Sequence, residues 1–320
     1  MSNINKKYMV IFFGILIAIM IASYILNTIV PAPYSIPGIF APGEEAKSSY
    51  TTIRDTAGNV VLQTGLPVHR DDEYINEKDI HYKIVQVNGN SAIAEQKQEQ
   101  TAQDTRAVFK YANMANHFAF TKYNPAKPDN GHHIVIYHTH SDESYIPTSG
   151  TDAKPGNGDI YDIGASMTDS LKTAGISVTH SYANHGPHDI NAYHRSRRTL
   201  ARLLKEQPDA AFDIHRDSAP LRAYATTING IDTARVMIVV GRSNPNVRTN
   251  LNYARSIKKR ADYLHPGLMR GIFIGRGDYN QDLYPTSLLF EIGSEHNSLQ
   301  AAQKAGVLLT DAIISLTWAK

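Results

Sequence analysis

Short apolar runs alternate with amphipathic segments from residue 132 to the C-terminus, and this alternation constrains the fold more than any other feature of the sequence. The expected strands are residues 132–138, 175–180, 210–215, 234–241, 271–275 and 287–293. Between them, apolar residues recur at helical spacing in Ile163, Met167 and Leu171, in Leu200, Leu203 and Leu204, and along residues 298–318. Strands rich in Ile and Val that alternate with helices predict an α/β fold, a twisted and mostly parallel sheet with helices on both faces.

Three of these strands end in, or are followed by, side chains of the types that bind metal ions, His and Glu. His140 and Glu143 follow the first strand in YHTHSDESY, His215 ends the third in DIHRDS, and Glu291 lies in the last, LLFEIG. In parallel sheets, functional groups gather beyond the carboxyl ends of the strands, so we expect these four side chains to meet. His138 is interpreted as a structural residue, because His140 is better placed at the strand end.

The chain contains no cysteine, so any metal ion must be held by His, Asp or Glu. His140, Glu143 and His215 supply two nitrogens and one carboxylate, which predicts a catalytic Zn²⁺ site with a fourth position open for water. Zinc lowers the pKa of such a water to roughly 7. Glu291 is then the expected general base, which takes the proton of the water and passes it to the leaving amine.

The acidic ligand has rivals within reach of His140. Asp142, Asp159 and Asp162 all lie in the segment that follows the first strand, as Glu143 does. The spacing alone does not choose among these four carboxylates.

Two aspartates flank His215, and we interpret Asp213 and Asp217 as residues that orient its ring and fix its tautomer. The alternative is an ion pair of either carboxylate with Arg216 or with a neighbouring residue. Glu291 lies within an apolar run, where an unpartnered carboxylate is costly to bury. A role at the metal site explains this position better than a place at the surface.

Residues 9–30 form a long uncharged apolar stretch and are predicted to be a transmembrane helix, preceded by a cytoplasmic tail, residues 1–8. Lys6 and Lys7 stand directly before it, so the positive-inside rule places the N-terminus in the cytoplasm. A cleaved signal peptide has a shorter apolar run, roughly 7–15 residues. We therefore expect a single-pass protein of the cell membrane with an extracytoplasmic catalytic domain.

Three further regions follow the anchor. Residues 31–49 are rich in Pro and Gly and are expected to be a linker. Residues 50–110 are expected to form a β-rich membrane-proximal region, with strands at 51–53 and 60–62 and a hairpin over 82–94. Residues 131–320 then form the catalytic domain. The 32 basic and 30 acidic residues nearly balance, so no electrostatic footprint for nucleic acid is present.

Four motifs in this order resemble the stage II sporulation protein P family: YHTHSDESY, DIHRDS, YNQDLYP at residues 279–285 and LLFEIGSEHNSL at residues 288–299. The layout of anchor, β-rich region and catalytic domain is also similar. The resemblance implies a zinc N-acetylmuramoyl-L-alanine amidase with a twisted α/β fold related to zinc exopeptidases. It further implies degradation of septal peptidoglycan during sporulation engulfment, with stage II sporulation proteins D and M as partners.

The resemblance also assigns residues. His140 and His215 match the histidines of the family and Glu291 matches its C-terminal glutamate, whereas the ligand role of Glu143 is our own inference. Cell-wall amidases usually take their glutamate ligand from further downstream of the first histidine, which keeps Asp159 and Asp162 as alternatives.

The mechanism expected on this interpretation is attack on the lactyl carbonyl, with Glu291 moving the proton to the alanine nitrogen. Two arginines are candidates to stabilise the oxyanion and three residues to line the substrate groove: Arg216 and Arg235, and Tyr279, Asn280 and Gln281. The three groove residues equally suit a capped loop. Competing functions are a zinc peptidase that acts on the peptidoglycan stem peptide and a non-catalytic wall-binding scaffold.

Overall fold

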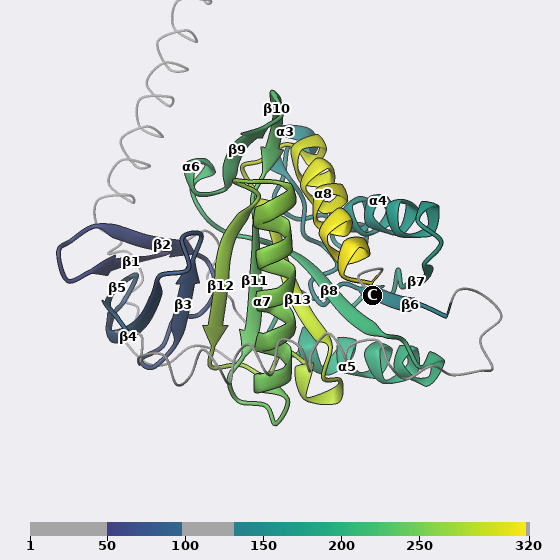
Figure 1. The fold of residues 1–320 in the computed structure, drawn as a ribbon, viewed down its shortest axis with the longest axis horizontal. Helices are drawn as coiled ribbons and strands as arrows, with labels where there is room; N and C mark the ends of the chain where they lie inside the picture. Colours follow the sequence, from purple (N-terminus) through teal and green to yellow (C-terminus); the bar gives the residue numbers. More distant parts are fainter. Residues whose placement is uncertain (1–49, 98–130, 318–320) are drawn as a thin grey trace, which may run out of the picture. The chain divides into compact units, whose positions relative to one another are not determined.

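An eleven-stranded sheet runs through residues 50–97 and 131–317, the part of the chain that the computed structural model describes (Figure 1). Its strand order is β2-β1-β5-β4-β3-β12-β11-β13-β8-β6-β7. The first five strands are β1 (Thr51–Asp55), β2 (Val60–Thr64), β3 (Glu73–Asn76), β4 (His81–Asn88) and β5 (Ser91–Gln96). The others are β6 (His133–Tyr137), β7 (Ser177–His180), β8 (Ala210–Asp217), β11 (Val236–Gly241), β12 (Met269–Gly275) and β13 (Ser287–Ser294).

Helices and one small hairpin connect these strands. The helices are α3 (Ile146–Ser149), α4 (Ile160–Thr173), α5 (Ala192–Leu203), α6 (Leu221–Tyr224), α7 (Val247–Leu264) and α8 (Leu299–Thr317). Strands β9 (Ala225–Ile228) and β10 (Ile231–Ala234) form the hairpin. The predicted α/β class is confirmed, and the six strands expected after residue 131 are all present. The sequence analysis did not identify β3 or the β9–β10 hairpin.

The sheet is mixed, so the expectation of a mostly parallel sheet holds only for its C-terminal part. Strands β13, β8, β6 and β7 run parallel, and β11 and β12 run parallel to each other but antiparallel to β13. The link from β12 to β13, residues 276–286, holds only the 3-10 turn Gln281–Leu283. It lacks the crossover helix that a parallel return normally requires, so the chain reverses direction.

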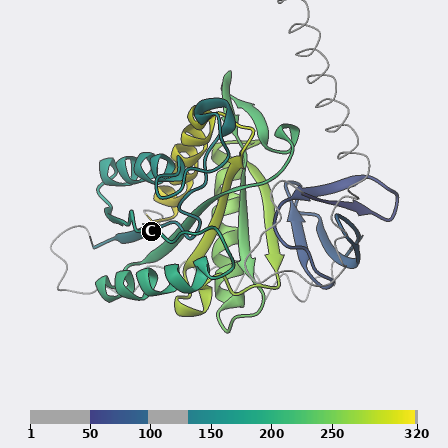
Figure 2. The ribbon, with the colours of Figure 1, turned by 180° about the vertical axis from the view of Figure 1, so that it is seen from behind.

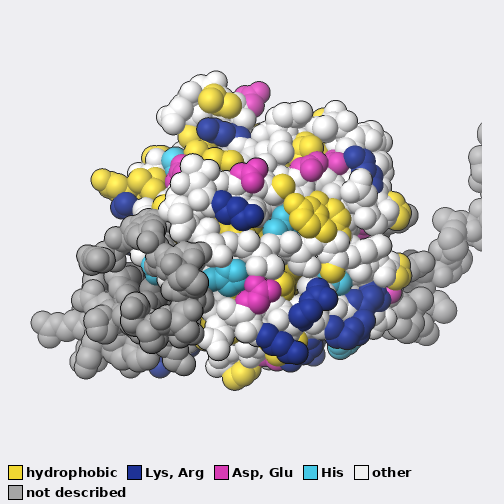
Figure 3. Space-filling view, turned by 90° about the vertical axis from the view of Figure 1, so that its right-hand side faces the viewer, with side chains coloured by type: hydrophobic (Ala, Val, Ile, Leu, Met, Phe, Trp, Pro, Cys, Tyr) yellow, Lys and Arg dark blue, Asp and Glu magenta, His cyan; other side chains and the backbone are white. Residues whose placement is uncertain are grey.

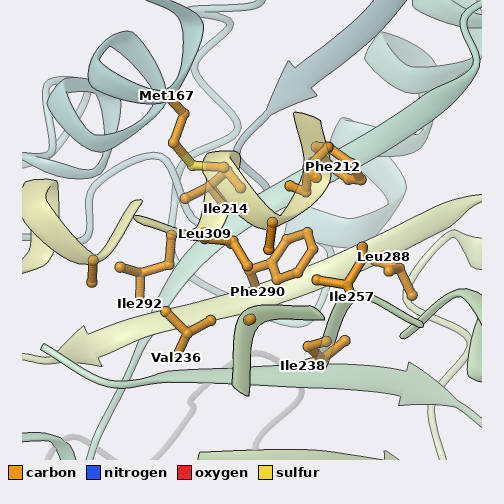
Figure 4. Close-up of a cluster of buried hydrophobic side chains, with 14 of the residues drawn as sticks. Met167, Phe212, Ile214, Val236, Ile238, Ile257, Leu288, Phe290, Ile292 and Leu309 are labelled. Carbon is orange, nitrogen blue, oxygen red and sulfur yellow. The ribbon is translucent and has the colours of Figure 1, made fainter. Parts of the chain in front are cut away.

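One face of the sheet is covered by α4, α7 and α8, which lie in front of it in Figure 1. Alternate residues of β8, β11 and β13 point into this layer and meet apolar helix residues. Figure 4 shows this cluster, which includes Met167, Phe212, Ile214, Ile238, Ile257, Phe290 and Leu309. Each fully buried side chain of this size contributes roughly 1.5–3 kcal/mol, so this layer is the main core of the fold.

The opposite face is covered by two different structures, α5 and the N-terminal strand group β1–β5. Both can be followed in Figure 2, which views the molecule from behind. Helix α5 packs Leu200 and Leu203 on Val135 of β6. The N-terminal strand group shares a core with the strands beside it: Ile53, Leu62 and Ile84 pack with Met237, Val239, Phe273 and Leu289. The prediction of helices on both faces is therefore correct only where α5 lies, because β1–β5 take the remaining area.

The N-terminal strand group also continues the sheet itself. Strand β3 pairs antiparallel with β12, and the Tyr74 hydroxyl donates to the carbonyl of Arg270 at 2.7 Å. Gly271 has a φ of 147°, and a Cβ there would lie 2.1 Å from the carbonyl oxygen of Ile75. Only glycine lets the two strands approach this closely. Residues 50–97 and 131–317 thus share one sheet and one core.

The predicted anchor, residues 9–30, lies outside the described residues, as do the tail, the linker and residues 98–110 of the expected β-rich region. Within residues 50–97 and 131–317, no helix has the length and apolar character that a membrane crossing needs.

Candidate metal centre

His140, Glu143 and His215 come together at the carboxyl ends of β6 and β8, and each offers one ligand atom within 4.8 Å of the others. The Glu143 Oε1 atom lies 3.3 Å from Nδ1 of His140 and 3.6 Å from Nδ1 of His215. All three side chains are buried. Two imidazole nitrogens and a carboxylate oxygen that face one another in this way form a set of donors that can hold a metal ion.

The loop after β6 holds Glu143 in place. Its Oε2 atom accepts a hydrogen bond from the backbone N–H of Arg216 at 2.9 Å, which leaves Oε1 turned toward the two histidines. Gly158 lies against this loop, and a Cβ there would lie 2.6 Å from the Glu143 carbonyl oxygen. The tight turn therefore depends on glycine at position 158.

The rival carboxylates lie elsewhere. Asp159 accepts the Tyr145 N–H at 3.0 Å and pairs with Lys154 at 2.6 Å, so it braces the loop. Asp162 is exposed on α4, and Asp142 lies 2.9 Å from His188. Among the described residues, Glu143 is the carboxylate that joins the two histidines in a metal-binding group.

Asp213 lies behind His215, with its Oδ1 atom 3.0 Å from Nε2 of the ring. Thr139 fixes the same carboxylate through its N–H at 2.8 Å and its hydroxyl at 2.5 Å. Burial raises the pKa of Asp213, but the attraction of His215 and the bonds from Thr139 outweigh it and hold that pKa below the usual value. A carboxylate on the ring nitrogen remote from the metal is the usual partner of a ligating histidine.

The other ring nitrogen of His215 faces Glu143. Burial lowers the pKa of His215, yet the attraction of Asp213 and Glu143 raises it well above the ordinary value. The two carboxylates thus create a negative site that favours a cation between them, whether a proton or a metal ion.

Two aromatic residues that the sequence analysis missed surround His140. The His188 ring stacks on it with centroids 3.9 Å apart, and the Tyr193 ring meets it edge-on at 5.5 Å. His188 comes from the loop between β7 and α5, and Tyr193 comes from the first turn of α5. The only signal in the sequence was the histidine-rich HGPHD, residues 185–189, in an otherwise polar loop.

Glu291 lies on β13 directly beside His215 of β8 in the parallel register. Its side chain is 2% exposed, and its Oε2 atom has no hydrogen-bond partner among the described residues. Burial raises the pKa of Glu291 well above its usual value, and repulsion from Asp217 adds to this. The attraction of His215 opposes both effects. A buried carboxylate beside a metal-binding group is well placed for proton transfer.

Asp217 does not contact His215 as expected but ties the site to the N-terminal strand group. Its carboxylate accepts the Thr64 hydroxyl at 3.0 Å, the Gly65 N–H at 2.8 Å and the Tyr224 hydroxyl at 2.9 Å. Arg270 lies 3.5 Å away. The end of β2 is therefore bonded to the residue two positions after His215.

Both candidate oxyanion arginines donate to backbone carbonyls, although the Nε of Arg235 has no hydrogen-bond partner among the described residues. Arg216 donates to the carbonyls of Ser144 at 3.0 Å and Asp152 at 2.7 Å, which clamps the loop that carries Glu143. Arg235 donates to the carbonyl of Met269 at 2.8 Å. Among the described contacts, Arg216 forms no ion pair with Asp213 or Asp217, and the ion pair of Asp217 is with Arg270.

The three residues expected to line the groove make hydrogen bonds and a ring contact within the fold. The Gln281 amide accepts the Gly241 N–H at 2.9 Å and donates to a β11 carbonyl at 2.8 Å. Asn280 donates to the Tyr193 carbonyl at 3.1 Å, and the Tyr279 ring lies 5.7 Å from the Tyr193 ring. These contacts fix the start of α5 and suit the alternative of a capped loop.

His138 lies outside the metal-binding group, and its contacts suit the structural role expected for it. Its Nδ1 atom is 3.0 Å from the Ile214 carbonyl oxygen, so this nitrogen carries the proton and donates. Its Nε2 atom then accepts from His180 at 2.7 Å. Gly164 leaves room for this pair, because a Cβ there would lie 2.5 Å from His180.

The fold and the site define an α/β protein with a His–Glu–His metal-binding group and a buried glutamate beside it. The chain matches the family model of stage II sporulation protein P over residues 57–314, and it belongs to this family. Stage II sporulation protein P of Bacillus subtilis (strain 168) is 30% identical over 204 residues, which are 58% of this chain and 51% of that protein. The chain thus spans about half the length of this curated relative.

Three solved amidase structures are similar to part of this chain, each with a TM-score below 0.5. N-acetylmuramyl-L-alanine amidase Ami1 of Mycobacterium smegmatis has 16% identity and a TM-score of 0.38, covering 59% of this chain and 98% of its own. Ami1 of Mycobacterium abscessus has 14% identity and a TM-score of 0.38, covering 58% and 98%. N-acetylmuramoyl-L-alanine amidase AmiC2 of Nostoc punctiforme has 15% identity and a TM-score of 0.36, covering 58% and 94%. Similarity at this level says nothing of the reaction.

Proposed function

We propose that this chain is a zinc-dependent N-acetylmuramoyl-L-alanine amidase, which hydrolyses the amide between muramic acid and L-alanine in peptidoglycan. The observation that supports the proposal most is the meeting of His140, Glu143 and His215 beside Glu291, in a chain that belongs to the stage II sporulation protein P family.

Zinc is the proposed ion because of the donor set. Calcium and magnesium favour oxygen ligands, whereas two imidazoles and one carboxylate suit zinc and leave a position open for water. The Glu143 Oε1 atom between the two Nδ1 atoms fits this choice, since its partner oxygen Oε2 is already bonded to a backbone N–H. When bound there, zinc supplies a Lewis acid that polarises a carbonyl and acidifies water.

Glu291 is the proposed general base and acid. Its pKa is raised in the buried site, and a cation held by the neighbouring ligands would favour the carboxylate and lower that pKa. Glu291 then takes a proton from the attacking water and delivers it to the nitrogen of the leaving L-alanine. Its unpartnered Oε2 atom is the position that holds the proton.

The remaining residues orient the ligands and limit access of water. Asp213 holds the His215 ring, and the Arg216 N–H holds Glu143. His188 and Tyr193 cover the His140 ring. Fixed ligands of this kind reduce the reorganisation that the transition state requires.

We further propose that the chain acts on septal peptidoglycan during sporulation engulfment, together with stage II sporulation proteins D and M. The uncharged stretch at residues 9–30 supports a single-pass membrane anchor, with residues 50–320 on the extracytoplasmic side. Membership in the sporulation family supports this setting.

The test is mass spectrometry of peptidoglycan digested by the purified full chain with zinc. Release of stem peptides that begin with L-alanine, leaving peptide-free glycan, is the expected result. Shortened peptides still attached to glycan would identify a zinc peptidase. Intact peptidoglycan, with zinc bound and proteins D and M added, would favour a wall-binding scaffold.

Two variants connect this activity to the site. Glu291→Gln should lower turnover by about 10²–10⁴-fold while the zinc content stays normal, because only the proton carrier is lost. His215→Ala should lose both zinc and activity. A His215→Ala protein with full zinc content would disprove the ligand assignment.

A further inference from the structure

A pocket of about 280 Å³ lies between α5 and residues 183–185, close to the metal-binding group but outside it. Its walls carry an unusual concentration of positive charge. The polar lining residues are Asn184, His185, Arg195, Arg198, Thr199 and Arg202. Figure 3, which views the side where α4, β7 and α5 lie in Figure 1, shows Lys and Arg side chains gathered on the lower half of that face.

The three arginines occupy one face of α5, because residues 195, 198 and 202 follow helical spacing. Arg195 is neutralised by Asp189 at 2.6 Å, and it donates to the backbone of the loop opposite. Arg198 and Arg202 are exposed, and no acidic side chain of the described residues pairs with either. Like charges four residues apart destabilise a helix, so Arg198 and Arg202 are not explained by a contribution to the stability of α5.

The pocket adjoins the metal-binding group through one residue. The His185 N–H donates to the Ser141 hydroxyl at 3.0 Å, and this hydroxyl lies 3.2 Å from the Asn184 amide oxygen. Ser141 directly follows His140. Helix α5 itself begins at the site, since the Tyr193 ring centroid lies 5.5 Å from that of His140. Along α5, Arg198 and Arg202 lie five and nine residues beyond Tyr193, which at about 1.5 Å per residue is roughly 7 and 13 Å along the helix axis.

We infer that Arg198 and Arg202 form a subsite for a free carboxylate of the peptidoglycan stem peptide; this rests on the proposed amidase function and specifies its substrate. Arginine binds carboxylates through paired N–H donors. In the stem peptide, a glutamate linked through its side chain follows the L-alanine, and its α-carboxylate is either free or amidated. The glutamate follows the L-alanine that carries the scissile amide. In an extended peptide its α-carboxylate therefore lies about 3.3 Å further from that amide than the L-alanine does.

The electrostatic state of the pocket agrees with this assignment. Burial lowers the pKa of His185, the bond to the His138 carbonyl and the attraction of Asp213 oppose this, and repulsion from Arg195 and Arg198 lowers the pKa further. The two arginines thus place positive charge beside this wall of the pocket. The Thr199 hydroxyl, 2.8 Å from the His185 ring, keeps this histidine satisfied without an acidic partner.

The experiment compares two soluble muramyl peptides that differ only in whether the glutamate α-carboxyl is free or amidated. The full chain with zinc should have the lower KM for the free acid. Arg198→Gln should raise that KM roughly five-fold, leave kcat unchanged and leave the KM for the amide unchanged. The effect should shrink in high salt, because these arginines are exposed. Lys259→Gln removes one charge from an exposed site on α7 and serves as the control.

Binding of the released peptide separates this inference from the amidase proposal. Calorimetry should show that the free-acid stem peptide binds more tightly than the amidated one, and that Arg198→Gln abolishes the difference. If the chain binds the free-acid peptide more tightly but hydrolyses neither substrate, the subsite is supported and the amidase proposal is refuted. Turnover with equal KM values for both substrates, or an equal effect of Arg198→Gln on both, would refute the subsite and leave the amidase intact.

Discussion

The Asp213 carboxylate lies 3.0 Å from Nε2 of His215, on the opposite side of the ring from Glu143. The two carboxylates therefore lie at different nitrogens of the imidazole. Asp213 fixes the ring, and Glu143 is its neighbour in the metal-binding group. Thr139 makes Asp213 immobile through two hydrogen bonds, so the ring orientation is set by β6 as well as by β8.

The Asp213→Asn variant should weaken zinc binding by about 10–100-fold, because the anchor loses its charge and no longer favours the metal-binding tautomer of His215. Asparagine keeps the size of the side chain, and its single amide oxygen can still accept one of the two Thr139 bonds, so the fold should persist. Competition with a chelator measures the affinity. Asp311→Asn, at a surface ion pair with His265, is the matched control. Unchanged zinc affinity in Asp213→Asn would show that the carboxylate does not support a ligand.

The contact between β2 and the loop after β8 should be sensitive to the size of residue 65. A Cβ on Gly65 would lie 2.6 Å from the Ser218 Cβ and 3.0 Å from its carbonyl oxygen. Gly65→Ala should therefore displace the Asp217 loop, lower kcat and reduce the free energy of unfolding by about 1–3 kcal/mol. Thr64→Val tests the same contact by removing one hydroxyl to Asp217, whereas Thr64→Ser keeps it. Equal kcat for all three variants and the wild type would exclude this coupling.

A fragment that begins at residue 131 should fail to fold. Removal of β1–β5 uncovers Met237, Val239, Phe273 and Leu289 and leaves β12 as an open edge. At roughly 1.5–3 kcal/mol for each side chain, the loss is comparable to the whole stability of a typical domain. Circular dichroism and size-exclusion chromatography of the fragment, beside a chain that starts at residue 50, measure this. A monomeric fragment with cooperative unfolding would contradict the shared core.

The stability of the N-terminal strand group should depend on pH through Glu73. Burial raises the pKa of Glu73, but His81 at 2.7 Å and Lys97 at 2.5 Å bring it down to about 2. Because the folded pKa lies below the unfolded one, the stabilisation is present above about pH 4.5 and is lost as the pH falls toward 2. Glu73→Gln should therefore cost about 1 kcal/mol at pH 7 and much less near pH 2.5.

Urea unfolding at the two pH values measures this difference, and the exposed Glu95→Gln serves as the control. A cost of Glu73→Gln that is the same at both pH values would rule out a contribution from the ionised carboxylate.

The meeting of His140, Glu143 and His215 was predictable because parallel strands end at one edge of a sheet, and β6 and β8 are parallel neighbours. The orientation of each ligand was not predictable. It depends on backbone donors such as the Arg216 N–H and on Asp213, whose contacts arise only from the register of the two strands.

Other features left weak signals in the sequence. Strand β3 has only four residues, EYIN, which gives no clear alternation, so its pairing with β12 could not be foreseen. The roles of Arg216 and Arg235 stay predictions, because an arginine near a site looks the same in sequence whether it faces substrate or a backbone carbonyl. The stripe of arginines on α5 was visible, but its nearness to Ser141 depends on the path of the loop at residues 183–185.

The pairing of β3 with β12 has a consequence for where the site can act. Because β1–β5 share one sheet and one core with the strands that carry the metal-binding group, residues 50–97 and 131–317 form one body. A partner that binds β1–β5 would therefore also set the direction in which Glu291 and its neighbouring ligands face.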